Sequence, residues 1–125
     1  MIAADSSSII AFLSGDSGTD VDSLEKALTV QTLMVPPVVL TEVLSDPKLP
    51  KQVGKIILGL PMIEILPGYW ERAGKTRAKI ISKALRVRVA DALIAQSCLD
   101  YDIPLITRDR DFRHFEKFAN LKVIW

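Results

Sequence analysis

The sequence has too little cysteine and histidine for several kinds of site. It contains one cysteine, Cys98, and one histidine, His114. A single cysteine cannot form an intrachain disulfide, and the two residues together cannot supply the four ligands of a structural zinc site. One imidazole also excludes acid–base catalysis by a pair of histidines. We therefore expect a reduced, cytoplasmic protein whose chemistry uses other side chains.

The sequence also lacks long apolar runs and an excess of charge of either sign. Its longest nearly apolar run, residues 56–63, is interrupted by Gly59 and Pro61 and is far shorter than the roughly 20 residues that cross a bilayer. The formal net charge is +1, which excludes a strongly basic protein. The first five residues have no basic segment, so we expect no secretory signal and no membrane contact. With 125 residues, the chain should form one domain, 1–125.

Short apolar runs alternate with longer segments of helical periodicity. The runs predict strands at residues 2–4, 33–35, 62–66, 105–107 and 123–125. Helices are predicted at about residues 7–14, 22–32, 37–45, 49–59, 68–85 and 91–101, the second of them starting with a capping box from Asp22 to Glu25. This alternation predicts an α/β fold, a three-layer α/β/α sandwich around a central parallel sheet of four to five strands.

Four acidic residues are placed to meet at one edge of this sheet. Asp5 ends the first strand, Asp109 follows a late strand, Glu42 lies on the third helix and Asp91 opens the last one. The carboxyl ends of the strands line the ligand crevice of an open α/β sheet, so these carboxylates should lie together. Singly, each acid could instead cap a helix, close a turn or face solvent, and these alternatives stay open. A cluster of four would need a divalent cation to neutralise it.

Four segments form a set of motifs: Asp5-Ser6-Ser7, residues 37–42 (PVVLTE), residues 90–95 (ADALIA) and residues 105–112 (LITRDRDF). Together they resemble the PIN-domain ribonuclease toxins of the VapC type, and the resemblance spans essentially the whole chain. It implies an α/β/α fold, dependence on Mg²⁺ or Mn²⁺, cleavage of an RNA substrate, a homodimer and inhibition by a cognate antitoxin protein.

The resemblance also assigns roles to individual residues. It implies that Asp5, Glu42, Asp91 and Asp109 are the catalytic, metal-binding acids. It implies that Asp111 is an auxiliary acid at the metal, and that Ser7 and Thr107 are hydroxyl residues beside the site. Residues 84–89 depart from the pattern, because relatives often have a glycine-containing polar loop there.

Basic side chains are concentrated in the second half of the chain. Residues 1–64 carry four basic and eight acidic side chains, whereas residues 65–125 carry twelve and seven. On the helix predicted at 68–85, we expect a buried face made of Trp70, Gly74, Ala78, Ile81 and Leu85. The RNA-binding candidates are Arg72, Lys75, Lys79, Lys83 and Arg86, which recur at spacings of three and four, and Arg77 at the edge of the apolar face. A face that is merely solvated is the other interpretation, and both stay open.

We therefore expect a metal-dependent endoribonuclease that is the toxin of a type II toxin–antitoxin system. A water activated by Mg²⁺ or Mn²⁺ would hydrolyse the phosphodiester and leave a 5′-phosphate and a 3′-hydroxyl. The alternative is a PIN-like scaffold that binds RNA or protein without cleaving it. A phosphoacceptor receiver domain is disfavoured, because the run at 62–66 contains no aspartate.

Overall fold

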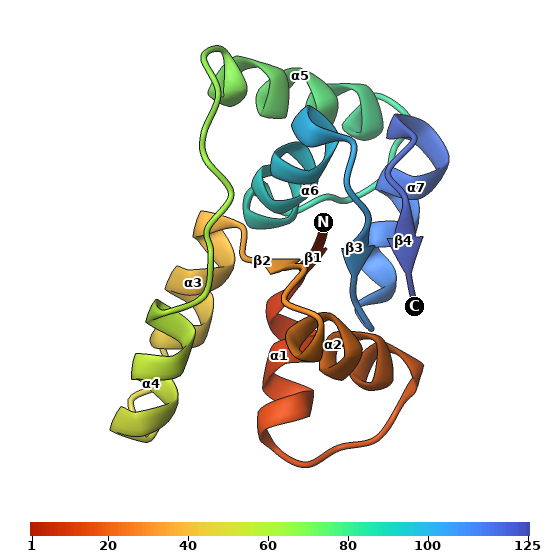
Figure 1. Cartoon of the computed structure of the whole chain (residues 1–125). Coiled ribbons are helices and arrows are strands. Elements are labelled where there is room, and N and C mark those ends of the chain that lie inside the picture. Colours follow the sequence, from red (N-terminus) through yellow and green to blue (C-terminus); the bar gives the residue numbers. More distant parts are fainter.

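Four short parallel strands form the central sheet of the computed structural model, which describes all of residues 1–125 (Figure 1). The strands are β1 (Ile2–Ala4), β2 (Leu33–Met34), β3 (Leu105–Ile106) and β4 (Val123–Ile124), in the order β2-β1-β3-β4. Ala3 pairs with Met34 on one side and with Leu105 on the other. The central strands are fully buried at Ala3, Ala4, Leu105 and Ile106, as expected for a parallel sheet covered on both faces.

Helices cover both faces of the sheet, and two more helices lie beside one of its edges. They are α1 (Ser6–Leu13), α2 (Thr19–Thr29), α3 (Pro37–Leu44), α4 (Lys51–Leu58), α5 (Tyr69–Ile81), α6 (Val89–Tyr101) and α7 (Arg113–Ala119), with a 3₁₀ turn, η1 (Arg110–Phe112). Figure 1 shows α1 and α2 on one side of the sheet and α5, α6 and α7 on the other, while α3 and α4 form a pair beside β2. None of these helices combines the length and the apolar composition that a bilayer crossing requires.

The strand predicted at 62–66 is reduced to one parallel bridge between Met62 and Val35. Val35 donates its amide to the Pro61 carbonyl at 2.8 Å and accepts from the Ile63 amide at 2.9 Å. Beyond Ile63 the segment leaves the sheet, and the carbonyl of Glu64 accepts a hydrogen bond from the Tyr101 hydroxyl instead. The sheet therefore has four strands, at the lower end of the predicted range.

Two predicted details of the helices are wrong. Helix α2 begins at Thr19 with Gly18 at its N-cap, so Asp22 lies inside the helix and forms no capping box. The buried face of α5 consists of Tyr69, Ala73 and Ile80, one residue away from the predicted face. The Tyr69 hydroxyl donates to a carbonyl of α6, a polar contact that an apolar pattern does not reveal. Trp70, at 62% exposure, faces solvent instead.

Helix α7 was not among the predicted helices. It has only seven residues and four of them are charged or histidine, which hides its periodicity. Phe112, Phe115 and Phe118 recur every three residues and are the signal that could have revealed it, since Phe112 and Phe115 are fully buried. Cys98 lies fully buried in the core, as its position on an apolar helix face predicts.

An ion pair between the exposed Arg108 and the buried Asp20 joins the segment after β3 to the start of α2. Arg108 donates to both carboxylate oxygens of Asp20, at 2.8 and 3.0 Å, and Ser8 donates to Asp20 at 2.7 Å. These contacts, Arg108 first, lower the pKa of Asp20 to about 2. A side chain at Gly18 (φ 152°) would place its Cβ 2.6 Å from the Asp20 carboxylate, so glycine allows the chain to pass this pair.

Asp20→Asn should lower the free energy of unfolding by about 2 kcal/mol near pH 7, as the lowered pKa implies. A carboxyl whose pKa falls on folding stabilises the protein above the pKa of the unfolded chain. That contribution disappears as the pH falls from about 4 to about 2. Urea denaturation of both proteins across the acidic range measures the difference.

Asp16→Asn is the matched control. Its carboxylate lies 3.7 Å from Arg108 and its side chain is 59% exposed, so its loss should cost less than about 0.5 kcal/mol. If Asp20→Asn were no less stable than Asp16→Asn, the ion pair would not have the structural role assigned to it.

Candidate metal centre

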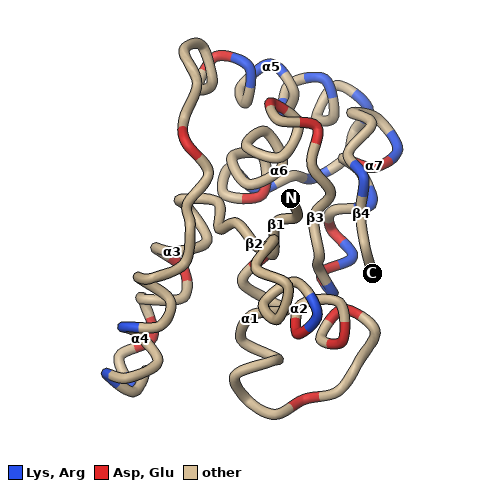
Figure 2. The backbone as a smooth tube through the Cα atoms, viewed as in Figure 1, with Lys and Arg blue, Asp and Glu red and all other residues tan.

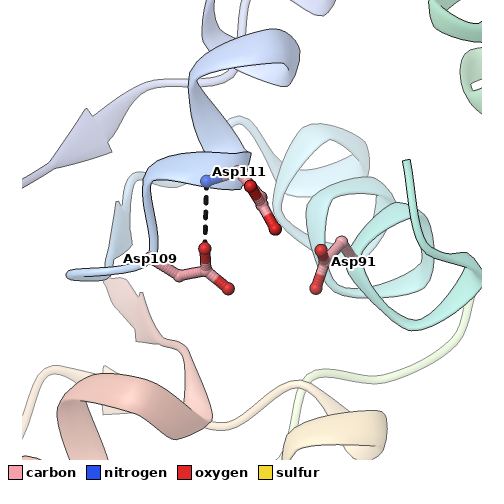
Figure 3. A group of neighbouring side chains, drawn as sticks. All are labelled: Asp91, Asp109 and Asp111. Atoms are coloured by element: carbon pink, nitrogen blue, oxygen red, sulfur yellow. Dashed lines mark hydrogen bonds between the residues drawn. The ribbon is translucent and has the colours of Figure 1, made fainter. Parts of the chain in front are cut away.

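Three aspartates from two parts of the chain meet beside the carboxyl edge of the sheet. Asp91 lies in the first turn of α6, and Asp109 and Asp111 lie at the start of η1. One carboxylate oxygen of each lies within 4.8 Å of those of the other two (Figure 3). The structure thus brings Asp91 and Asp109 together as expected and places Asp111 in the same group, whereas Asp5 and Glu42, the other two acids expected there, are not part of it.

Asp5 is held by two hydroxyls behind this group. One of its carboxylate oxygens accepts hydrogen bonds from Ser7 at 2.8 Å and from Thr107 at 2.9 Å. The Thr107 hydroxyl in turn accepts from the amide of Asp109 at 3.0 Å. Asp5 and Asp109 are therefore connected through one buried threonine, and Ser7 and Thr107 lie beside the acids as the resemblance implies.

Ser6 joins Glu42 to Asp5, a connection that the sequence analysis missed. Its hydroxyl donates to Glu42 at 3.1 Å and lies 3.4 Å from Asp5. Three serines in a row after Asp5 were the available signal. On a helix they point in different directions, and Ser8 accordingly contacts Asp20 on the far side.

The alternative roles of the acids as helix caps apply to only one of them. Asp109 caps η1, because its Oδ1 accepts from the amide of Asp111 at 2.9 Å. Asp5 occupies the N-cap position of α1 but makes no capping hydrogen bond through its side chain. Asp91 is the third residue of α6, whose N-cap is Arg88. Capping therefore does not explain why Asp5 and Asp91 are buried.

Burial and mutual repulsion raise the pKa values of these acids. Burial is the main cause of a raised pKa at Asp5, Glu42 and Asp91, and the charge of Asp109 adds to it at all three. The pKa of Asp91 rises to about 7. Arg88 is the basic residue that opposes this effect at Asp91 and Glu42.

Asp91 carries the observation that bears most directly on a metal. Its Oδ2 is buried and has no hydrogen-bond partner, although buried carboxylate oxygens are normally paired. This oxygen belongs to a residue of the three-aspartate group, whose ligands are all carboxylate oxygens. Such hard oxygen ligands suit Mg²⁺ or Mn²⁺, so the residues present fit a divalent cation.

The RNA-binding candidates on α5 and just after it differ in whether they are paired within the protein. Lys75, Lys79, Lys83 and Arg86 are exposed, and Figure 2 shows basic residues along α5 and the segment that follows it. Arg72 instead donates to both oxygens of Asp100, at 2.9 and 2.7 Å, and so ties α5 to α6. An RNA-binding role for the exposed members stays a prediction.

Residues 84–89 form a turn in which alanine occupies a position that favours glycine. Ala84 has a φ of 62°, the left-handed conformation that glycine adopts most easily. The backbone thus makes the turn without glycine. The residues that follow, Arg86 and Arg88, are both exposed.

Comparisons with solved structures show similar folds over the whole chain. One is VapBC2 from Rickettsia felis, crystallised bound to a DNA fragment from the promoter, with a TM-score of 0.73 and 21% identity over 99% of this chain and 98% of that one. Another is VapBC-5 from Mycobacterium tuberculosis, a member of the VapBC family of toxin–antitoxin systems, with a TM-score of 0.68 and 19% identity over 98% of this chain and 96% of that one. Likeness at this level of identity shows the fold, and it confirms the predicted PIN-like α/β architecture.

Comparison with curated proteins finds no match. The family model for the PIN domain, however, matches residues 2–118, which is nearly the whole chain. The matched region includes every acid of the candidate metal centre. The chain belongs to the PIN domain family.

Proposed function

We propose that this protein is a metal-dependent endoribonuclease and the toxin of a type II toxin–antitoxin system, acting in the cytoplasm. The observation that carries this proposal is the three-aspartate group, in which a buried oxygen of Asp91 has no partner. Membership of the PIN domain family and the fold shared with VapBC structures support it.

Asp91, Asp109 and Asp111 would hold Mg²⁺ or Mn²⁺, with Asp5 and Glu42 at the edge of the same site. The bound cation would supply charge neutralisation at the phosphodiester and acidify a coordinated water. Asp5 keeps a fixed orientation because Ser7 and Thr107 bond the same carboxylate oxygen.

We assign to Glu42 the role of orienting the attacking water. It is half-buried, it accepts a hydrogen bond from Ser6, and its pKa is raised by burial, which makes it a better proton acceptor. Asp91, Asp109 and Asp111 belong to the three-aspartate group, and Asp5 accepts two hydroxyl hydrogen bonds on one oxygen. Attack by water on phosphorus, with the bond to the 3′-oxygen breaking, leaves a 5′-phosphate and a 3′-hydroxyl, and the ribose 2′-hydroxyl takes no part.

An antitoxin would cover apolar surface on the early helices. A hollow of about 480 Å³ lies between the end of α2 and the segment after α4, and Leu28, Leu33 and Leu60 line it. Nearby on α4, Ile56 and Leu58 are more than 60% exposed. A basic side chain of the antitoxin, above all arginine, would pair with the carboxylates of the metal centre.

A homodimer would use a different surface, formed by α5 and α6. A largely apolar hollow of about 390 Å³ there is lined by Trp70, Ala73, Gly74, Arg77, Val89, Ala92 and Leu93. Trp70 and Val89 are 62% and 57% exposed. A second copy is the occupant we propose, because a two-fold axis lets the Trp70 of each copy enter the hollow of the other.

The raised pKa of Asp91 gives the first test. In chelator near pH 8, Asp91→Asn should raise the free energy of unfolding by about 2–4 kcal/mol, because the buried carboxylate is ionised only at a cost. The gain should shrink as the pH falls from about 7 towards 4, where the wild-type acid takes up its proton. Asp102→Asn, at an exposed residue, is the control.

Added metal should make the wild type more stable than Asp91→Asn, the reverse of their order in chelator. Mn²⁺ should raise the melting temperature of the wild type by mass action and leave Asp91→Asn unchanged. Calorimetry that finds equal Mn²⁺ binding by the wild type and by Asp5→Asn/Asp91→Asn would contradict the metal assignment.

Toxicity and cleavage test the function itself. Expression of the chain alone should arrest growth, co-expression of the adjacent open reading frame should relieve the arrest, and purified protein should cleave RNA unless EDTA is present. Asp91→Asn at equal expression should neither arrest growth nor cleave. Binding of RNA without any cleavage in Mn²⁺ would favour the scaffold alternative, and arrest by Asp91→Asn would separate toxicity from this site.

The dimer surface is tested by Trp70→Ala. This change should convert a dimer into a monomer in sedimentation experiments, because it removes the largest exposed side chain of the surface. Ile56→Ala, at an equally exposed residue of α4, should leave the oligomeric state unchanged. A monomeric wild type would refute the proposed dimer.

A further inference from the structure

A cavity of about 720 Å³ lies directly beside the three-aspartate group. It is lined by Arg77, Ile81, Leu85, Arg86, Val87, Arg88 and Asp111. Asp111 belongs both to this lining and to the acidic group, so the cavity and the candidate metal centre share a wall. The volume falls in the range of about 300–1,000 Å³ that is typical of small-molecule sites.

The charge of this cavity is positive, and none of its arginines forms an ion pair. Three guanidinium groups face one carboxylate in the lining, and the ion pairs of the protein involve Arg72, Arg108, Arg113 and Lys122 but none of these three arginines. Arg77 donates its Nε to the carbonyl of Val87 at 2.9 Å, which positions its terminal nitrogens. The side chains of Arg86 and Arg88 donate no hydrogen bond within the protein.

The rest of the lining is apolar. Ile81 is 41% exposed, Leu85 is half-buried and Val87 is buried. Arginine forks bind phosphate through paired hydrogen bonds, guanidinium planes stack on bases, and apolar side chains pack against bases that leave the stack. A cavity with both properties matches a nucleotide better than it matches a simple anion.

We propose that this cavity binds the nucleotide next to the cleaved bond in single-stranded RNA. Arg86 and Arg88 contact its phosphate, and Ile81 and Leu85 pack against its base. Because Asp111 belongs to both the cavity and the acidic group, the phosphodiester next to a nucleotide bound in the cavity would lie at the acidic group. The inference rests on the proposed nuclease function and adds to it the segment of substrate that the protein recognises.

The first test measures binding in EDTA, so that it does not depend on cleavage. A fluorescent single-stranded RNA of mixed sequence should bind Arg86→Gln/Arg88→Gln about tenfold more weakly than the wild type. Because the contacts to one phosphate are lost, the slope of log affinity against log salt should fall by about 0.7. Lys51→Gln/Lys55→Gln removes the same charge from exposed positions of α4 and should change neither quantity.

A second variant tests the base contact. Ile81→Ser leaves the charge intact and should weaken RNA binding about fivefold with an unchanged salt slope, because only the apolar wall is altered. The affinity for inorganic triphosphate should stay the same in this variant.

The outcomes separate this inference from the proposed function. Equal RNA affinity of the arginine variant and the Lys51/Lys55 control would overturn the cavity assignment even if the wild type cleaves RNA. Wild-type affinity of Ile81→Ser would overturn the nucleotide assignment and leave a phosphate site. Strong, arginine-dependent binding by a protein that never cleaves RNA in Mn²⁺ would refute the nuclease alone.

Discussion

The constraint on which the site depends is the burial of like charges at one edge of the sheet. Burial raises the pKa values of Asp5, Glu42 and Asp91, and the repulsion between them adds to that cost. The fold offsets part of it with hydroxyl donors and with the nearby positive charge of Arg88. The oxygen of Asp91 that still has no partner marks a part of this cost that a bound cation would offset.

Three consecutive residues after β3 connect the acidic site to other parts of the molecule. Thr107 donates to Asp5, Arg108 pairs with Asp20 on α2, and Asp109 joins the acidic group. Their side chains reach three separate places, so the position of this short segment is determined from several directions. A site assembled in this way keeps its geometry without any disulfide, and the one cysteine is buried in the core.

Acidic and basic side chains of the second half of the chain lie next to each other in the folded molecule. The acids meet beside the sheet edge, whereas the unpaired arginines line the cavity that shares Asp111 with them. A phosphodiester chain is attracted to the arginines and repelled by the acids unless a cation lies between. Under the proposed function, RNA would be attracted through one surface and cleaved at the adjacent one, in keeping with the modest net charge of +1.

The sequence by itself determined the four strands of the sheet and the position of Asp5 and Asp109 at its edge. Strands 2–4, 105–107 and 123–125 were predictable because short apolar runs and the connections between them define a parallel sheet, and Asp5 and Asp109 then fall at the same edge. Only the tertiary structure decided the start of α2, the buried face of α5 and the setting of Arg72, since each depends on a polar contact between distant segments. Arg108 with Asp20, the Tyr69 hydroxyl with α6, and Arg72 with Asp100 are such contacts. Local periodicity measures only apolar spacing along one segment, so it cannot register a hydrogen bond to a residue far away in the chain.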